Sequence, residues 1–429
     1  MTEPPDTRNR VATLGPSGLV RAAVETLITE FFEPLAADEL LRDAWAGATA
    51  AVRRAGRSDV PSPPEFPGDP EGAYRVHDQA FPTLERLARG LLSPDELATA
   101  ALDELLTRRR DAHTVLLVPR GRFWPFEDDP TSPAGWASRS FGMTLTDTSP
   151  LTVIDVLARG PAQRAGVRRG QPVLAINGRP TIHLRRPQAM ARLNWQPGAV
   201  NVLKVCGPST HSVNLELQSE LMPMPYTEIL PGQIGLLRMD GFAASDLEAA
   251  ALRVALEGFE QAGARGWIVD MRWNGGGPSI QLSRLLIDKG RLFSRIRFNE
   301  VHLPDGTLLP KRQDIDFDAT ALPIQRPLVI LIGPGSISGA ESFAGPMQAY
   351  VRAKLVGERS AGACGLVRTV HLAAGWTICL ATHHTDFGPD ERQLNRIGIS
   401  PDVVIAPTPE DEAAGRDPQL EAAVDMLHV

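Results

Sequence analysis

The stretch LVILIGPGSISGAE (residues 328–341) determines how the second half of the chain is built. Its first five residues are apolar and mostly β-branched, and they have the length of a buried strand. The glycine-proline-glycine that follows ends this strand and brings Ser336 and Ser338 to the next turn. A mostly helical segment is predicted from Glu341 onward, with an interruption at Gly345-Pro346.

A serine between a strand and a helix can have either of two roles. The first backbone N–H groups of a helix have no partner within the helix, so they can stabilise an oxyanion that forms beside the serine. This favours a nucleophile at Ser336 or Ser338. The serine can equally be a simple helix cap, so the rest of the chain has to decide between the two roles.

Composition limits the class of protein. With 429 residues, 43% hydrophobic and 22% charged, the chain is long enough for two or three folded domains. The net charge of -7 comes without a basic stripe, so nucleic acid is not an expected partner. Cys206, Cys364 and Cys379 form no CxxC pair, so we expect no disulfide, no metal and no cofactor.

The N-terminal residues MTEPPDTRNRVATLGPSG are polar and rich in proline. They lack the apolar core of a secretory signal, and no stretch of the chain approaches 18 apolar residues. We therefore expect no membrane insertion and a cytoplasmic location, or an exported protein if the N-terminus has been trimmed.

The pattern of apolar and polar residues changes twice along the chain. Residues 1–137 are mainly helical in pattern, with apolar positions three and four apart. Residues 138–219 consist of short strand patterns separated by glycines, and residues 220–429 alternate strands with helices. The last part predicts an α/β core with a largely parallel sheet and functional residues at the carboxyl ends of its strands.

The segment GPAQRAGVRRGQPVLAINGRPT (160–181) resembles a PDZ domain. In that family a loop of backbone N–H groups captures a peptide C-terminus, and the peptide adds a strand to the sheet edge. The resemblance implies a peptide-binding role for Ser140, Phe141, Gly142 and Met143. The alternative is that this part only braces the catalytic domain.

Three further segments complete a family resemblance: VDMRWNGGGP (269–278), GSISGAESFAG (335–345) and IGISPDVVI (397–405). With the PDZ-like segment they resemble the S41 serine peptidases, which include carboxyl-terminal processing peptidases and the related tricorn core and nisin-resistance peptidases. The resemblance covers roughly residues 85 to 407. It implies an α+β multidomain protein with an N-terminal helical region, a PDZ-like β domain and a crotonase/ClpP-like α/β protease core.

The same resemblance implies site residues. Ser338 would be the nucleophile, and the backbone N–H groups of Gly339 and of the turn at Gly275 and Gly276 would hold the oxyanion. Processing peptidases activate their serine with a lysine about 25 positions downstream, but Ala363 stands at that position here. The Ser-Lys dyad is therefore absent.

The segment RRRDAHT (108–114) resembles the histidine segment of tricorn-like and nisin-resistance-like members, which makes His113 the expected general base. A neutral imidazole can accept the serine proton near neutral pH. Asn395, just before the closing segment, is the expected third member that orients the imidazole. Asp111, Asp386 and Glu391 remain alternatives for that role.

The preferred hypothesis is a serine endopeptidase acting on protein or peptide substrates, with homo-oligomerisation left open. The rival is a catalytically silent peptide-binding or scaffold protein that lost the family lysine. A crotonase-like acyl-CoA enzyme is a third, weaker alternative. His383-His384 on a predicted strand point to opposite faces and do not predict a metal site, and Cys364 is interpreted as a packing residue.

Overall fold

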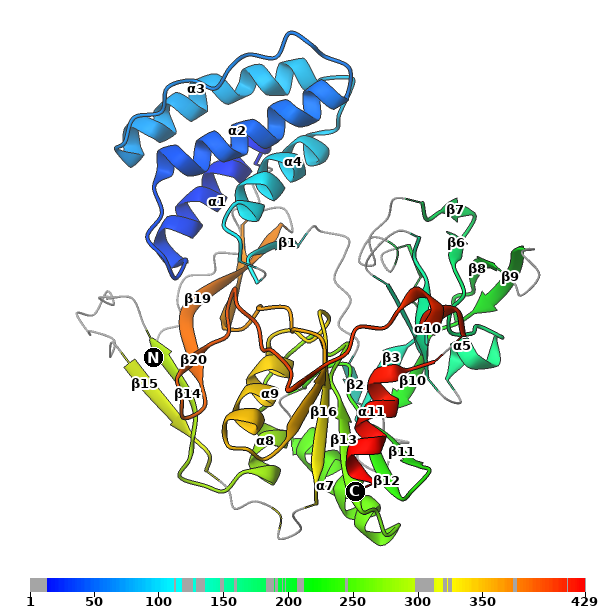
Figure 1. The fold of residues 1–429 in the computed structure, drawn as a ribbon. Helices are drawn as coiled ribbons and strands as arrows, with labels where there is room; N and C mark the ends of the chain where they lie inside the picture. Colours follow the sequence, from blue (N-terminus) through cyan, green and yellow to red (C-terminus); the bar gives the residue numbers. More distant parts are fainter. Residues whose placement is uncertain are drawn as a thin grey trace. The chain divides into compact units, whose positions relative to one another are not determined.

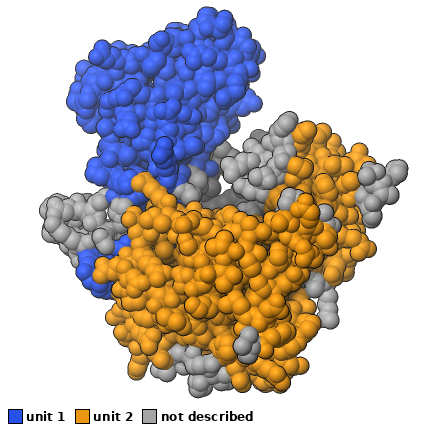
Figure 2. Space-filling view, in the orientation of Figure 1, with its two compact units in different colours: residues 1–122, 295–314, 363–386 blue, residues 123–294, 315–362, 387–429 orange. Residues whose placement is uncertain are grey.

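The computed structural model describes residues 14–428, except 112, 118–125, 129–135, 147–149, 158–159, 183–188, 190–191, 195, 197, 207–211, 244–245, 298–311, 319–321, 323–325, 373–375 and 415. The chain divides into two compact units, which Figure 2 shows in different colours. Unit 1 comprises residues 1–122, 295–314 and 363–386. Unit 2 comprises residues 123–294, 315–362 and 387–429. Each unit is described by itself.

Four helices make up most of unit 1 (Figure 1). Local sequence explains where they begin. The carboxylate of Asp69 accepts a hydrogen bond from the N–H of Gly72 at 2.6 Å, and Ser93 and Glu96 form a capping box. The helices are α1 (Pro16–Glu30), α2 (Ala37–Arg54), α3 (Pro70–Ala88) and α4 (Pro94–Thr107).

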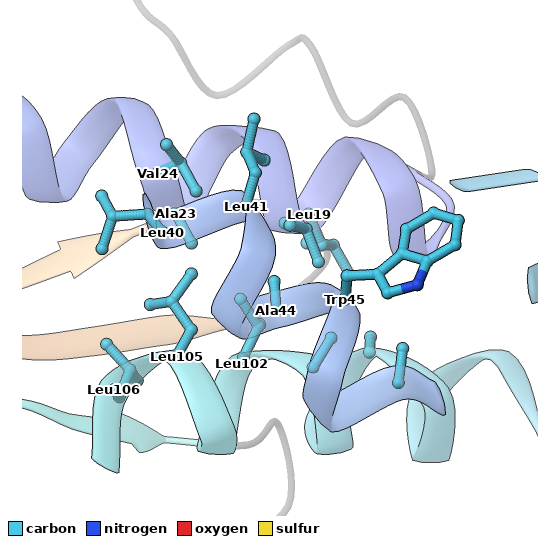
Figure 3. Packing of buried hydrophobic residues seen from close by; sticks show 14 of the residues in the cluster. Leu19, Ala23, Val24, Leu40, Leu41, Ala44, Trp45, Leu102, Leu105 and Leu106 are labelled. Carbon is cyan, nitrogen blue, oxygen red and sulfur yellow. The ribbon is translucent and has the colours of Figure 1, made fainter. Parts of the chain in front are cut away.

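The core of unit 1 lies between these helices. Figure 3 shows Leu40, Leu41 and Ala44 of α2 close to side chains of α1 and α4. Their three- and four-residue spacing places them on one face of α2, which confirms the helical periodicity of the sequence. Gly47 allows α2 and α4 to approach closely, because a Cβ atom there would lie 2.2 Å from the carbonyl oxygen of Ala100.

Short strands complete unit 1. β19 pairs antiparallel with β1 on one side and with β18 on the other. Trp376 and Ile378 are buried in the same apolar cluster as the helices, so the strands and helices share one core. Unit 1 also contains residues 295–314, where the guanidinium of Arg295 forms an ion pair with Asp314 at 2.7 Å. The strands are β1 (Val115–Leu117), β18 (Leu366–His371) and β19 (Thr377–Phe387).

Unit 2 contains a group of short strands that we call the β module, residues 138–219. Residues 160–181 contain a short helix, α5 (Pro161–Arg164), and the turn after β6 (Val173–Ile176) is built on Asn177 and Gly178, both with positive φ. An apolar core that includes Phe141 and Leu203 fills the module. Its strands are β4 (Met143–Leu145), β5 (Val153–Val156), β6 (Val173–Ile176), β7 (Arg179–Pro180), β8 (Asn201–Cys206) and β9 (Ser212–Leu217); β3 (Trp136–Ser140) pairs with β2 (Phe126–Asp128) and β10 (Glu220–Pro223).

The second part of unit 2 is built on a six-stranded sheet of order β11-β12-β13-β16-β17-β21. Every pair from β12 to β21 is parallel, so the carboxyl ends of these strands meet at one edge, as the sequence predicts. All residues of β13 and β16 are buried, which fits a sheet covered on both faces. The strands are β11 (Tyr226–Leu230), β12 (Ile234–Arg238), β13 (Gly266–Asp270), β16 (Leu328–Ile332), β17 (Lys354–Gly357) and β21 (Val403–Val404).

Helices cover both faces of this sheet. Leu420 and Ala423 of the C-terminal helix pack on Ile234, Val329 and other residues of one face. On the other face, Gly235 lies against the ring of Phe259 from α7, where a Cβ atom would come within 2.5 Å of that ring. The helices are α7 (Asp246–Gln261), α8 (Ile280–Leu286), α9 (Gly339–Ala349), α10 (Pro409–Ala414) and α11 (Pro418–Leu427); the remaining strands are β14 (Leu292–Arg297), β15 (Arg312–Asp316) and β20 (Arg392–Gln393).

One local prediction is wrong. The sequence predicts that Gly345-Pro346 interrupts the helix after the serines, but α9 continues through Pro346 to Ala349. Both residues are buried, and Gly345 lies beside Leu394. Packing of this segment in the core offsets the loss of one backbone hydrogen bond at the proline.

Candidate active site

Ser338 lies immediately before α9, at the carboxyl end of the central strand β16. Its φ is +56° and its ψ is -106°, a left-handed conformation that is costly for a residue with a Cβ atom. Such strain is common where a side chain has to be presented for chemistry. The backbone N–H of Ser338 donates to the carboxylate of Glu341 at 3.2 Å, which helps to hold this conformation.

Ser336 has a supporting role. Its side chain is fully buried, its Oγ donates to the carbonyl oxygen of Met271 at 2.8 Å, and it accepts from the N–H of Gly333 at 3.0 Å. These bonds connect the turn after β16 to the segment after β13. Both hydrogen bonds occupy the Ser336 hydroxyl, so of the two serines Ser338 is the one presented at the helix start.

Residues 274–277, which we call the glycine loop, lie directly against residues 333–338, which we call the serine turn. A Cβ atom on Gly276 would come 2.6 Å from the Cβ atom of Ser338, and one on Gly339 would come 2.0 Å from the carbonyl oxygen of Gly277. Only glycine allows this approach. The structure thus brings Ser338, Gly339 and Gly276 together.

Two of the predicted oxyanion donors already have acceptors. The N–H of Gly275 donates to the backbone carbonyl of Asp240 at 2.9 Å, which fixes the loop to the end of β12. The N–H of Gly276 donates to the side-chain oxygen of Asn274, also at 2.9 Å. The N–H of Gly276 can exchange its side-chain acceptor for a substrate oxygen more readily than the N–H of Gly275 can leave a backbone carbonyl.

Glu341 is a site residue that the sequence analysis missed. Its carboxylate is buried and accepts from the N–H of Ser338, from the N–H of Gly362 at 2.8 Å and from the hydroxyl of Ser360 at 2.5 Å. Ser360 in turn accepts from the N–H of Ile399 at 2.7 Å. Glu341 therefore links the serine turn to the two segments in which the family resemblance placed the lysine and the closing motif.

The residue at the position of the family lysine, Ala363, has no ionisable side chain. Ala363 is 1% exposed, and Cys364 beside it is equally buried. An alanine carries no group that can accept a proton. Any general base for Ser338 therefore has to come from another part of the chain.

His113 belongs to unit 1, whereas Ser338 belongs to unit 2. Both ring nitrogens of His113 are buried and have no hydrogen-bond partner among the described residues. Burial lowers the pKa of His113 below its usual value, and the nearby charge of Asp111 opposes this only in part. The imidazole is therefore neutral at neutral pH, which is the state that a general base requires.

The candidates for the residue that would orient the His113 imidazole differ in their surroundings. Asn395 is buried in unit 2, in a turn whose next residue donates its N–H to the carbonyl of Gly362. Asp111 accepts from the backbone N–H of His113 at 3.0 Å and from Thr114, so it shapes the histidine turn. Asp386 is buried in unit 1, and Glu391 is exposed in a turn of unit 2.

Six charged residues of unit 2 form a closed ring of ion pairs. Asp155 and Arg169 come from the β module, Arg238 and Asp270 from β12 and β13, and Arg272 and Asp417 from the segments around them. Arginines and aspartates alternate around the ring, with N to O distances from 2.8 to 3.6 Å. The ring connects the β module to the segment that leads into the glycine loop.

Asp270 and Arg272 form the central pair of the ring. Burial alone would raise the pKa of Asp270, but Arg272 and Arg238 hold it well below its usual range. Burial likewise opposes the charge of Arg272, and Asp270 and Asp417 together raise its pKa well above the usual value. Both groups therefore remain ionised.

The predicted peptide-binding residues contribute mainly to the core of the β module. Phe141 and Met143 are buried in its apolar cluster, so only their backbone groups could contact a peptide. The N–H of Gly142 donates to the Oγ of Ser140 at 2.9 Å. Ser140, Gly142 and Met143 line a cavity of about 30 Å³ together with Asp240 and Trp273, which leaves room for about one water molecule.

No group of three or more His, Cys, Asp or Glu side chains in the described part of the chain is arranged to hold a metal ion. His383 contacts the hydroxyl of Thr382 through its Nδ1 at 2.7 Å. Among the helices of the same described residues, none is both long and apolar enough to cross a membrane.

The sequence model of peptidase family S41 matches residues 233–405, from β12 to the residue after β21. This range contains the glycine loop, the serine turn and Glu341. The resemblance of this part of the chain to peptidase family S41 is confirmed. The chain is accordingly a serine peptidase, a hydrolase that acts on peptide bonds of protein substrates.

Relatives of this S41 peptidase include two cyanobacterial proteins. The carboxyl-terminal-processing protease of Synechocystis sp. is 28% identical over 381 residues, which cover 82% of each chain. The corresponding protease of Picosynechococcus sp. is 27% identical and covers 80% of this chain and 81% of its own length. The similarity thus extends beyond the protease core.

A solved structure supports the fold of this S41 peptidase. The photosystem II D1 C-terminal processing protease is 19% identical, and the match covers 97% of this chain and 98% of that chain with a TM-score of 0.51. At this identity the likeness shows a common mixed α/β fold and no more.

Asp240 is expected to make the stability of this S41 peptidase depend on pH. Desolvation raises the pKa of Asp240 to about 6; Arg238 opposes the shift, and the charges of Asp155 and Asp270 add to it. Because the folded state holds this proton more tightly than the unfolded state, stability should fall as the pH rises from about 4 to about 6. Asp240→Asn should therefore be more stable than the wild type above pH 6, and the difference should vanish below about pH 4.

Urea unfolding at a series of pH values measures this difference. Asp246→Asn, which changes an exposed aspartate on α7, is the matched control. An Asp240→Asn difference that stays constant from pH 3.5 to 7.5 would contradict the assignment.

Proposed function

We propose that this S41 peptidase is a serine endopeptidase that processes the carboxyl-terminal segments of protein or peptide substrates. The observation that carries the proposal is Ser338, held in a left-handed conformation against Gly276 at the start of α9. The names of the cyanobacterial relatives, which are carboxyl-terminal-processing proteases, support the choice of substrate.

The proposed reaction begins with attack of the Ser338 hydroxyl on the scissile carbonyl carbon. His113 takes the hydroxyl proton and passes it to the leaving amine, which leaves an acyl-enzyme on Ser338. Water, deprotonated by His113, then attacks the acyl carbon and releases the carboxylate product. The lowered pKa of His113 supports this role, because it favours the neutral imidazole.

We assign the oxyanion to two backbone donors. The N–H of Gly339 is the first, since it immediately follows the nucleophile. The N–H of Gly276 is the second, and it would exchange the side-chain oxygen of Asn274 for the substrate oxygen. Gly275, bonded to the backbone of Asp240, keeps the loop in place.

Asn395 is proposed to orient His113 by accepting from its second ring nitrogen. An amide oxygen can fix the tautomer, although it stabilises an imidazolium less than a carboxylate does. Its place in the turn bonded to Gly362 supports this assignment, because Gly362 also contacts Glu341 of the serine turn.

The β module is proposed to act as a PDZ-like domain that recognises the carboxyl end of the substrate. The relevant groups would be the backbone N–H groups of residues 140–143. The cavity beside them, about 30 Å³, is too small for a peptide terminus. Binding would therefore require the module to separate from Asp240 and Trp273.

A catalytically silent scaffold is the second candidate function. One observation favours it: the buried Ala363 at the lysine position supplies no base. In this case Ser338 would be an ordinary hydroxyl, and the β module alone would bind peptides.

Labelling with a fluorophosphonate probe distinguishes the two functions. Intact mass should show one adduct on the wild type, none on Ser338→Ala, and labelling at least about 100-fold slower on His113→Ala, since the base is removed. The labelling rate should fall on acidification with a midpoint below pH 6.5, because burial lowers the pKa of His113.

Matched controls are Ser400→Ala, an exposed serine, and His371→Ala, a histidine bonded to Thr377. Both should label like the wild type. Folded wild-type protein that remains unlabelled, even with a substrate peptide present to open the site, would favour the scaffold.

A further inference from the structure

A groove runs along unit 1 between α2 and α4, and neither the peptidase chemistry nor the β module uses it. Its volume is about 1040 Å³, at the upper end of the range for small-molecule pockets. The part of α4 that lines it, from Asp95 to Thr107, spans thirteen residues and about 18 Å. The groove therefore has the length of about three helical turns.

The floor of the groove is made of small and apolar residues. Gly47, Ala51 and Trp376 are buried, and Ala50 and Ala100 are half-buried. Small side chains on two adjacent helices leave a trough without bulky obstacles. A ridge of apolar side chains could lie against this surface and bury it from water.

The rim carries negative charge at a regular spacing. α4 contributes Asp95 and Glu96 at one end of the groove and Asp103 and Glu104 two turns further on. Residues eight positions apart are separated by about 12 Å along a helix and by about 80° around it, and both Asp95 and Asp103 line the groove. The opposite wall contributes one cation, Arg54.

Two of these four carboxylates are engaged locally. Glu96 caps its own helix through Ser93, and Glu104 forms an ion pair with Arg108 at 2.7 Å. Asp95 and Asp103 have no hydrogen-bond or ion-pair partner among the described residues. Both side chains are exposed, so their charges are open to a cation from outside the chain.

We propose that the α2–α4 groove is a docking site for an amphipathic α-helix of another polypeptide, with an apolar ridge and two basic side chains two turns apart. The apolar ridge lies along Ala50, Ala51 and Ala100, and the basic side chains meet Asp95 and Asp103. The helix contributes about twelve residues, which matches the length of the groove. This is binding of a helix in a groove, in which spacing along the helix sets specificity.

A fluorescein-labelled 14-residue peptide tests the spacing directly. The probe has a ridge of leucine and alanine and two lysines at positions i and i+7 on the same side. One control peptide has the same composition but carries the lysines at i and i+3. The other keeps the i,i+7 spacing but has glutamates in place of the lysines. Anisotropy with the full-length protein should show the i,i+7 lysine peptide binding at least about tenfold more tightly than either control.

Variants of the protein locate the binding site. Replacing Asp95 and Asp103 together with asparagine should weaken binding of the probe about tenfold, and raising the salt concentration should weaken it in the wild type. Thr99→Trp, which fills the groove between the two aspartates, should abolish binding. Glu65→Gln, an exposed acid outside the groove, is the matched control and should bind like the wild type.

Three results would overturn the proposal. They are equal affinity for the three peptides, no binding of any of them to folded protein, and binding that Thr99→Trp and the aspartate variants leave unchanged. A concentration-dependent dimer that Thr99→Trp disrupts would assign the groove to a second copy of the chain and overturn it as well. Circular dichroism and thermal unfolding confirm that each variant is folded, and the double asparagine variant tests the site without adding bulk.

Discussion

Replacing Arg272 with methionine is expected to lower the free energy of unfolding by about 3–5 kcal/mol. Arg272 is buried and contacts Asp270 through Nε and Nη2 at 3.0 and 2.8 Å, and Asp417 through Nη1 at 2.8 Å. Methionine fills similar space but leaves two buried carboxylates without this partner. The cost is the uncompensated charge, which Arg238 and Arg169 offset only in part.

Urea unfolding, together with hydrogen exchange of the β12 and β13 amides, measures this loss. Arg312→Met is the control, because Arg312 forms an exposed ion pair with Asp314, and such pairs contribute at most about 1 kcal/mol. Arg272→Lys should be intermediate, since lysine keeps the charge but lacks the planar fork. A loss below about 1 kcal/mol for Arg272→Met would show that the ring does not stabilise unit 2.

Glu341→Gln is expected to reduce kcat/KM about 100-fold while leaving the fold intact. The carboxylate accepts from Ser338, Ser360 and Gly362, whereas a glutamine amide would turn its NH₂ group toward at least one of these donors. The serine turn would then shift relative to the loop at 360–362. The effect should fall on kcat more than on KM, because the change alters the position of the nucleophile and not the substrate surface.

Peptide-substrate kinetics and the rate of fluorophosphonate labelling measure this effect, and both should fall together. Glu257→Gln on α7, an exposed glutamate, is the matched control. Activity of Glu341→Gln within threefold of the wild type would refute a positioning role. If Glu341→Gln is inactive and circular dichroism shows that it is unfolded, Ser360→Ala becomes the test, because it removes one of the three donors to the Glu341 carboxylate.

Much of the site was accessible from local sequence. The apolar run before Ser338 predicts a buried strand, and Gly276 and Gly339 mark the points where the loop and the helix start approach each other. The alternation after residue 233 predicts parallel strands, and their carboxyl ends do meet at one edge. The strands follow from residues close in the chain, so apolar patterning is enough to predict them, whereas the two glycines were assigned through the family resemblance.

The role of Glu341 had a sequence signal that was overlooked. Ser338 and Glu341 are spaced as the first and last residues of a capping box, which predicts a carboxylate bonded to the backbone N–H of the serine. The two further donors, from Ser360 and Gly362, lie 19 and 21 positions away and could not be read from this pattern. The interruption expected at Pro346 failed for a related reason, because burial of α9 outweighs the local preference.

The ring of arginines and aspartates was decided by tertiary structure alone. Arg169 and Asp417 are 248 positions apart, and neither has a neighbour in sequence that predicts the contact. The sequence by itself determined the strands, the helices and the serine turn, because these follow from hydrophobic periodicity and from glycine and proline positions. Only the folded chain decided that Asp155, Arg169 and Asp417 join this ring, because their partners come from distant segments and a buried charge is stable only where such partners neutralise it.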